Sequence, residues 1–292
     1  MLKSGTEGST EVWIGDRRPH PTTGQSRGVE IAEATQLLRA SIRRAFNRSW
    51  PSGGAATLFF SGGLDSSLLA LLAQGSGRET TLFTVGLPGS RDFFAAANSA
   101  ILLGTRFVPR AVTQVEVKAS VQHLRKSYPN LRGNDLSVQV SMDLALSHAP
   151  GAMIVCGQGA DELFIGYRHT FELAGVSLAE RGEKDLRKLR ETDWPITLDL
   201  AVRHGKVLVA PFLDTDFIAQ VSRIPWEVRK GDEPKSLLRE VARSLGLPEE
   251  IARLPKRAFQ YGTGIHKVVQ ATMSNYPSTT VPPLPFNARG RP

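Results

Sequence analysis

A short apolar run that opens into a Ser-Gly-Gly turn constrains the fold of this chain more than any other stretch. Residues 55–60 have the length and aromatic content of a buried strand, and residues 68–73 are typical of a helix. Between the two lies the sequence Ser61-Gly62-Gly63-Leu64-Asp65-Ser66-Ser67. This order predicts a strand–turn–helix unit whose turn lies at the carboxyl end of the strand.

The chemistry of this turn favours phosphate binding. Glycine has no Cβ, so backbone N–H groups can approach a ligand closely, and the N-terminus of the following helix carries partial positive charge. Ser61, Ser66 and Ser67 add hydroxyl donors. Asp65 would repel a phosphate unless a cation lay between them, and Mg²⁺ is the simplest such cation. The alternative is a plain Gly-Gly turn followed by a Ser/Asp helix cap.

Alternating strands and helices predict an α/β fold. Further strands are expected at 80–85, 105–108 and 152–156. The helices expected between and after them are 93–103, 114–127, 136–148, 163–173, 179–190, 196–204, 234–245 and 264–273. Strands separated by helices of ten or more residues predict a parallel sheet with helices on both faces, followed here by a mostly helical C-terminal part. Ligands of such sheets bind where the strands end.

The chain length allows one large domain or two smaller ones, because it has 292 residues. We expect a single folded domain at 29–272, opened by an amphipathic helix at 29–50. Residues 1–28 show no hydrophobic periodicity and are expected to form a flexible arm. The proline-rich stretch 273–292 has few apolar residues and is expected to be a disordered tail.

The net charge of +8 favours anionic partners. A nucleotide alone satisfies this bias, and a nucleic-acid partner is not expected, since no basic stripe is interleaved with aromatic residues. No apolar stretch approaches 18 residues, so no membrane partner is expected. The one cysteine, Cys156, excludes an internal disulfide and fits a reducing compartment, so the chain is expected to be cytoplasmic.

A second glycine-rich turn, Gly157-Gln158-Gly159, follows the strand expected at 152–156 and is itself followed by Asp161 and Glu162. Asp161 and Asp65 would then lie on the same edge of the sheet, where two carboxylates suit Mg²⁺ held against a triphosphate. An acidic first turn of a helix is the alternative interpretation. Lys235 and Lys256 each follow a loop signal and are the candidate cations.

Several motifs in order resemble the synthetase domain of asparagine synthetases, within the N-type ATP pyrophosphatase (PP-loop) superfamily. The matched stretches are 61–67, 85–90, 157–164 and 211–214. Residues 255–262 are most similar to the shorter archaeal and eukaryotic asparagine-synthetase-domain proteins. The resemblance covers roughly 29–270 and implies an adenine nucleotide alpha hydrolase-like fold.

The resemblance also implies a role for each matched residue in binding ATP and Mg²⁺. The pyrophosphate of ATP would be held by Ser61, Gly62, Gly63, Asp65, Ser66 and Ser67. Backbone atoms of Phe59, Val85 and Gly157 would frame the adenine and ribose. Asp65 and Asp161 would ligate Mg²⁺. Lys256 would stabilise charge on the α-phosphate and the departing pyrophosphate, and Lys235 would help neutralise phosphate.

The implied activity is that of an ATP-dependent amide ligase that forms AMP and pyrophosphate. A substrate carboxylate would attack the α-phosphorus, and ammonia or an amine would then attack the acyl-adenylate; aspartate to asparagine is the first version to expect. The lysines and loop would act by charge stabilisation and positioning. An adenylating enzyme that acts on tRNA and a non-catalytic nucleotide-binding subunit remain the alternatives.

Three departures from the family limit what the resemblance carries over. Met1 is followed by Leu2 and not by the cysteine of a glutaminase domain, so we expect ammonia to come from solution or from a separate glutaminase subunit. Gln158 stands where relatives have Glu or Tyr, and a glutamine cannot serve as a general base. Val207 and Val209 replace a Glu and an Arg, which predicts an altered acceptor half of the site.

Overall fold

The computed structural model describes residues 24–50, 54–255 and 262–274, with the side chains described from residue 30 on. Its first half alternates strands and helices: α1 (Gly24–Ser49), β1 (Ala56–Phe59), α2 (Leu64–Gly75), β2 (Thr80–Gly86), α3 (Arg91–Leu102), β3 (Phe107–Ala111), α4 (Gln114–Ser127), α5 (Gly133–His148) and β4 (Met153–Val155). The remainder is mostly helical: α6 (Ala160–Leu163), α7 (Arg168–Phe171), α8 (Gly175–Lys188), the π-helix η1 (Leu189–Asp193), α9 (Trp194–Arg203), β5 (Val207–Val209), the 3₁₀-helix η2 (Pro211–Leu213), α10 (Thr215–Ser222), α11 (Trp226–Lys230), α12 (Ser236–Ser244), α13 (Glu249–Ala252) and α15 (Ile265–Ser274).

The strands of the described ranges form one parallel sheet in the order β3-β2-β1-β4-β5. The chain runs outward from β1 through β2 to β3, then returns to the other side of β1 with β4 and β5. The strand order therefore reverses between β1 and β4, which opens a crevice at their carboxyl ends. The expected parallel sheet is confirmed, and both glycine-rich turns leave the two strands that flank this crevice.

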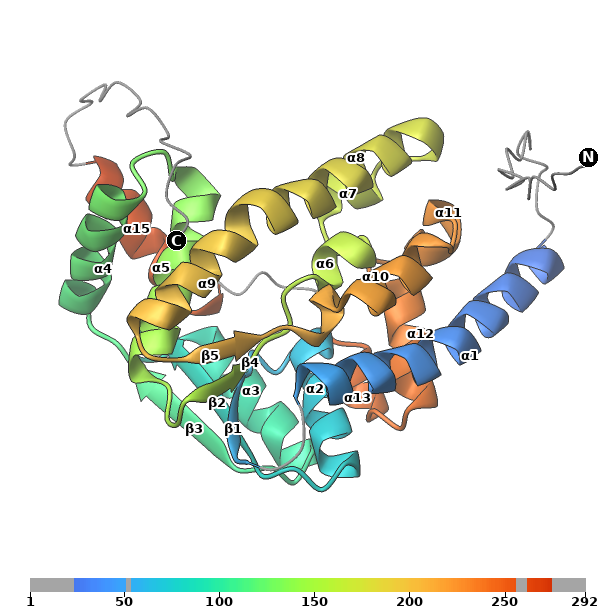
Figure 1. Ribbon diagram of the computed structural model, residues 1–292, viewed down its shortest axis with the longest axis horizontal. Coiled ribbons are helices and arrows are strands. Elements are labelled where there is room, and N and C mark those ends of the chain that lie inside the picture. Colours follow the sequence, from blue (N-terminus) through green and yellow to red (C-terminus); the bar gives the residue numbers. More distant parts are fainter. Residues whose placement is uncertain (1–23, 51–53, 256–261, 275–292) are drawn as a thin grey trace, which may run out of the picture.

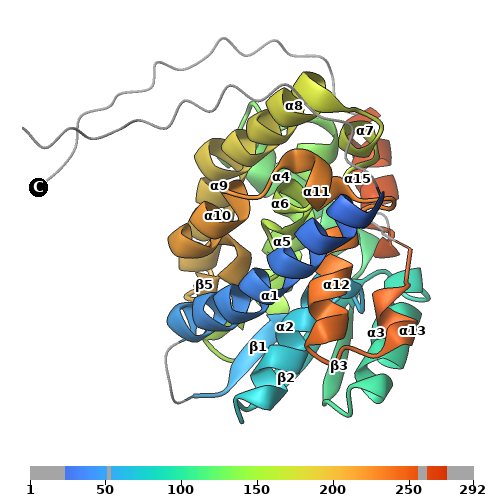
Figure 2. The same ribbon diagram turned by 90° about the vertical axis from the view of Figure 1, so that its right-hand side faces the viewer.

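Successive strand residues point to opposite faces of the sheet, so the two faces support separate hydrophobic cores. Leu58 pairs in register with Leu82, and both pack with α1, α2, α3, α10 and α12. The next pair, Phe59 and Phe83, packs on the other face with α4, α5, α9 and α15. Figure 1 and Figure 2 show the sheet between these two groups of helices, which confirms the expected fold class.

The structure differs from the expected elements at several places. Residues 163–173 do not form one helix, because Ile165 takes a left-handed conformation (φ 54°) before Gly166 and separates α6 from α7. The strand β5 was not expected, and α10, α11 and α13 were not expected either. Helix α1 begins at Gly24, five residues before the expected start at residue 29.

No helix within the described ranges is both long enough and apolar enough to cross a membrane.

Candidate functional site

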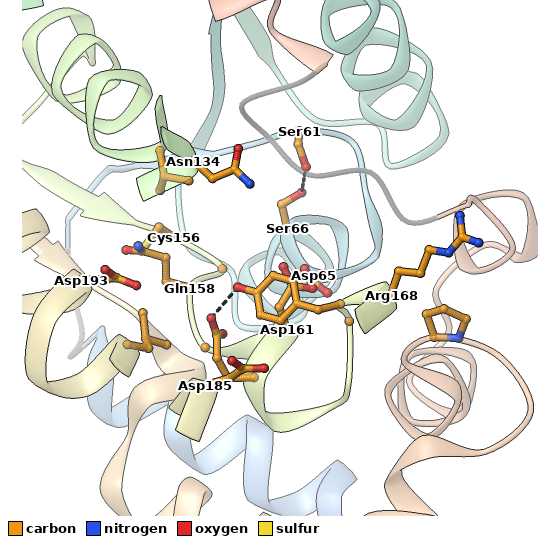
Figure 3. A pocket seen from close by; sticks show the side chains of 18 of the residues that line it. Ser61, Asp65, Ser66, Asn134, Cys156, Gln158, Asp161, Arg168, Asp185 and Asp193 are labelled. Atoms are coloured by element: carbon orange, nitrogen blue, oxygen red, sulfur yellow. Dashed lines mark hydrogen bonds between the residues drawn. The ribbon is translucent and has the colours of Figure 1, made fainter. Parts of the chain in front are cut away.

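A cavity of about 1290 Å³ lies where β1 and β4 end. The turn after β1 contributes Ser61, Asp65 and Ser66 to its wall, and the turn after β4 contributes Gly157 and Asp161. Helices α5, α7 and α8 and the π-helix η1 form another part of the wall, and residues of α3, of α12 and of the loop before α12 also line the cavity. Figure 3 shows Asp65 and Asp161 next to each other in the centre of the close-up, below Ser61 and Ser66. The two predicted turns therefore form one site.

Gly62 allows the first turn to pack directly on α3. Its φ is 74°, and a Cβ on this residue would lie 2.6 Å from the carbonyl oxygen of Ala95. The hydroxyl of Ser99 donates a hydrogen bond to the Gly62 carbonyl at 2.8 Å, which fixes the turn. Glycine is required here for both its conformation and its size.

The hydroxyls of the first turn gather at the start of α2. Ser61 Oγ lies 3.4 Å from Ser66 Oγ, and the backbone N–H of Gly63 donates to Ser61 Oγ at 3.4 Å. No side chain caps the N-terminus of α2, whose N-cap residue is Gly63. Hydroxyl donors beside an uncapped helix N-terminus suit an anion such as phosphate.

The second turn packs against the first and against η2. Gly159 has a φ of 98°, and a Cβ there would lie 2.7 Å from Cδ2 of Leu213. A Cβ on Gly157 would lie 3.3 Å from Cβ of Asp65, so the two turns are in close contact. Because neither glycine has a side chain, the turn after β4 can approach the first turn closely enough to bring Asp161 next to Asp65.

Lys235 joins the two carboxylates. Its Nζ lies 2.5 Å from Oδ2 of Asp65 and 2.6 Å from Oδ1 of Asp161, and its side chain is 3% exposed. Burial lowers the pKa of Lys235, but the charges of Asp161 and Asp65 outweigh it and hold the pKa above its ordinary value. Lys235 therefore stays protonated, and the ion triad ties the site to the helical C-terminal part.

Glu162, which is buried, and Tyr167, which is half-buried, form a hydrogen-bonded pair beside this triad. The Tyr167 hydroxyl donates to Oε1 of Glu162 at 2.6 Å, and both residues line the cavity. Burial, followed by the charge of Asp161, raises the pKa of Glu162 to about 7. Neither residue was assigned a role from the sequence, because the five-residue spacing of Glu162 and Tyr167 matches no recognisable motif.

The donor set fits a magnesium ion that also binds phosphate. Within the part of the chain that the structure describes, no three His, Cys, Asp or Glu side chains are grouped to hold a metal alone. Asp65 and Asp161 nevertheless converge on a common cationic group, and with Lys235 they leave a net charge of −1. Mg²⁺ commonly binds one or two carboxylates together with substrate phosphates, so these two residues would hold it.

A separate array of charges lines another part of the cavity. Lys188 Nζ lies 2.8 Å from a carboxylate oxygen of Asp135 on α5 and 2.8 Å from one of Asp193 on η1. In a π-helix the backbone bonds join residues five apart, so Lys188 and Asp193 stack on one side; in an α-helix they would diverge. Gln139 donates to the Asp193 carbonyl at 3.0 Å and holds the array in place.

Most of the predicted site residues lie at the cavity. Those that line it are Phe59, Ser61, Asp65, Ser66, Gly157 and Asp161. Gly62, Gly63 and Ser67 form the turn and the first turn of α2 behind the lining. The Val85 side chain is fully buried, which leaves its backbone for any contact with a ligand. Lys256 lies outside the described residues.

The residues that depart from the family pattern, Gln158, Val207 and Val209, lie in two different parts of the structure. Gln158 lines the cavity, and its Oε1 lies 3.7 Å from the Cys156 thiol. Val207 and Val209 do not line it: they lie on the edge strand β5, where Val207 is 56% exposed. The two valines therefore contribute no side chain to the described wall of the cavity, and an altered acceptor half stays a prediction. Asp135, Lys188 and Asp193, which line another part of the cavity, were not predicted from the sequence.

The sheet is parallel, and a Ser-Gly-Gly turn and two acidic residues lie where its strand order reverses. This arrangement is typical of nucleotide-binding α/β proteins. The family described as asparagine synthase matches residues 37–201 and 199–281, so the chain belongs to the asparagine synthase family.

Three relatives illustrate the similarity. A Methanocaldococcus jannaschii protein named "Putative asparagine synthetase [glutamine-hydrolyzing] 1" is 28% identical over 84% of this chain and 52% of its own length. The human glutamine-hydrolysing asparagine synthetase is 29% identical over 80% of this chain and 44% of its own. The mouse asparagine synthetase domain-containing protein 1 is 34% identical over 44% of this chain and 22% of its own. The chain thus spans about half the length of the first two relatives.

Proposed function

We propose that this protein is an ATP-dependent amide ligase that adenylates a carboxylate, releases pyrophosphate and then transfers the acyl group to ammonia or an amine. One observation carries the proposal. Asp65 and Asp161, delivered by different strands, meet at Lys235 in the cavity where the Ser61 and Ser66 hydroxyls also gather. Membership of the asparagine synthase family supports ATP as the nucleotide.

The first turn would hold the phosphate chain of ATP. Ser61 and Ser66 would donate hydroxyl hydrogen bonds, and the backbone of Gly62 and Gly63 together with the α2 N-terminus would supply N–H groups. Ser67 lies fully buried at the start of α2 and would support the turn from behind. These contacts would leave pyrophosphate in the turn when the α–β bond breaks.

The base and sugar would lie beside the backbone of Phe59, Val85 and Gly157. Phe59 and Gly157 line the cavity at the ends of β1 and β4, and β2 carries Val85 next to β1. Asp65 and Asp161 would hold Mg²⁺, which when bound supplies positive charge to the phosphate oxygens. Lys235 and Lys256 would supply positive charge that stabilises the negative charge building on the leaving pyrophosphate.

The second substrate would bind on the side of the Asp135–Lys188–Asp193 array. The array lines the same cavity, and Figure 3 shows Asp193 on the Gln158 side, away from Ser61 and Ser66. Gln158 cannot accept a proton from the incoming amine, so the amine must arrive deprotonated or lose its proton to another group. Aspartate is the first substrate to test, and ammonia would come from solution or from a separate glutaminase subunit in the cytoplasm.

A substrate panel tests the proposal. The protein is incubated with ATP, Mg²⁺, ammonium and single carboxylates, aspartate first, and AMP and pyrophosphate are measured. We expect one carboxylate to produce both in equal amounts, with the amide as the third product. If ATP binds but no carboxylate releases AMP above the rate of the Asp65→Asn variant, the ligase assignment is wrong.

A further inference from the structure

The Lys235 ammonium occupies the point at which a cation shared by Asp65 and Asp161 would lie. It contacts one carboxylate oxygen of each residue, at 2.5 and 2.6 Å. The two carboxylates reach the cavity, with side chains 24% and 25% exposed, whereas the lysine side chain is 3% exposed. The lysine therefore approaches the acids from the protein side, and a ligand would approach them from the cavity side.

The protein holds the backbone of Lys235 in place. Its φ of 63° is a left-handed conformation that few residues with a side chain adopt. Arg239 Nε donates to the Pro234 carbonyl at 3.1 Å, and the N–H of Arg239 donates to the Lys235 carbonyl at 2.9 Å. Only the end of the lysine side chain is therefore positioned to respond when a ligand binds.

Gly166 provides the space for this contact. A Cβ on Gly166 would collide with Oδ1 of Asp161 and would lie 2.6 Å from Cε of Lys235. Gly166 also lines the cavity. A side chain at position 166 would therefore block the approach of the Lys235 side chain to the Asp161 carboxylate.

The charge balance makes metal binding depend on phosphate. Two carboxylates and one ammonium carry −1 in total, so a divalent ion that entered alone would meet a cation already shared by both of its ligands. A phosphate chain changes this balance because its oxygens can accept the ammonium hydrogen bonds and at the same time bind the metal.

We propose that Lys235 is the resident counter-ion of the nucleotide-free site, so that Asp65 and Asp161 bind a divalent metal only together with a phosphate chain that takes over the lysine ammonium. This inference rests on the proposed assignment of the two carboxylates as metal ligands. Metal and nucleotide then bind together, and the metal does not bind before the nucleotide.

Manganese binding without nucleotide tests the inference. Free Mn²⁺ is titrated against the full chain and followed by electron paramagnetic resonance, with no ATP present. We expect Lys235→Met to bind one Mn²⁺ at least tenfold more tightly than the wild type. Lys267→Met, which removes the same charge from an exposed lysine, should behave as the wild type does. Equal affinity of Lys235→Met and wild type, or tight binding by the wild type alone, would overturn the inference.

A double variant locates the metal. Adding Asp161→Asn to Lys235→Met should abolish the gained Mn²⁺ affinity; a gain that persists would place the metal elsewhere and overturn the inference. Lys235→Gln serves if the methionine variant does not fold, as judged by circular dichroism, and the same tenfold criterion applies. This assay contains no nucleotide. A negative result in it can therefore be distinguished from a negative result in the AMP-release assay, which tests the proposed ligase.

Discussion

Lys235 and Asp65 are 170 positions apart in the sequence, yet Nζ of the lysine lies 2.5 Å from Oδ2 of the aspartate. Asp65 belongs to the first strand–turn–helix unit, and Lys235 precedes α12 in the helical C-terminal part. The same ammonium lies 2.6 Å from Asp161 after β4. Three distant parts of the chain therefore complete one site, and α12 belongs to it as much as the sheet does.

The Gly62→Ala substitution should destabilise the fold through the contact with α3. Both Gly62 and Gly77 have positive φ, 74° and 66°, but only at Gly62 would a Cβ meet the Ala95 carbonyl, at 2.6 Å. We expect Gly77→Ala to lower the free energy of unfolding by about 1 kcal/mol, as conformational strain alone does, and Gly62→Ala by about 3 kcal/mol. Urea denaturation measures both. Equal losses would contradict the close packing of the turn on α3.

Asp214 has a structural role that should disappear at low pH. It accepts hydrogen bonds from Arg48 at 2.9 and 2.5 Å and from the N–H of Phe217, which caps α10. The Arg48 hydrogen bond holds the pKa of Asp214 below its ordinary value. Its contribution is therefore present above the unfolded pKa and is lost as pH falls through the folded one.

We expect Asp214→Asn to lower the free energy of unfolding by about 1 kcal/mol at pH 7, with the difference from the wild type closing below about pH 3. Asp216→Asn is the matched control, because Asp216 contacts the same arginine at 3.3 Å but its side chain is 76% exposed. Its effect should be close to zero. A difference for Asp214→Asn that stays constant down to pH 2 would contradict this assignment.

Cys156 should be chemically inert in the folded protein. Burial raises the pKa of its thiol to about 12, from an ordinary value of 9.0. At pH 8 its thiolate fraction should be about 10³-fold lower than in the unfolded chain, and the thiolate is the reactive form. Since the chain has one cysteine, alkylation monitored by mass spectrometry reports this thiol alone. Modification in native buffer as fast as in denaturant would contradict the burial.

Lys188→Ala should weaken binding of the second substrate and leave that of ATP unchanged. Lys188 is held between Asp135 and Asp193 on the part of the wall assigned to that substrate. We expect KM for the carboxylate to rise at least tenfold while KM for ATP stays within about twofold. Lys184→Ala provides the control, since this lysine lies on the same helix and is exposed. An effect on KM for ATP alone would assign the array to the nucleotide.

The sequence predicted the sheet and the convergence of the two glycine-rich turns because both depend on local patterns. An apolar run before a Ser-Gly-Gly turn specifies a strand, a turn and the start of a helix within a short stretch of the chain. The turn after β4 repeats this arrangement, so the approach of Asp161 to Asp65 followed from the parallel sheet. Lys235 was expected near phosphate, but its position between the two acids depends on tertiary packing.

The remainder could not be predicted for physical reasons. Residues 163–173 contain one glycine, Gly166, but the break between α6 and α7 comes from Ile165 before it. The left-handed conformation of Ile165 cannot be read from the sequence. The π-helix that aligns Lys188 with Asp193 leaves no pattern in the sequence, since residues five apart share no face of an α-helix. The three-residue strand β5 is too short to show an alternating period.

The transfer of oxygen from the carboxylate to AMP tests the proposed chemistry most directly. Carboxylate labelled with ¹⁸O at both oxygens is incubated with ATP, Mg²⁺, ammonium and the protein, and the products are analysed by mass spectrometry. Attack of the carboxylate on the α-phosphorus predicts one ¹⁸O atom in each AMP and none in the pyrophosphate. Unlabelled AMP, or ADP with ¹⁸O in inorganic phosphate, would contradict the assignment of this site to carboxylate adenylation.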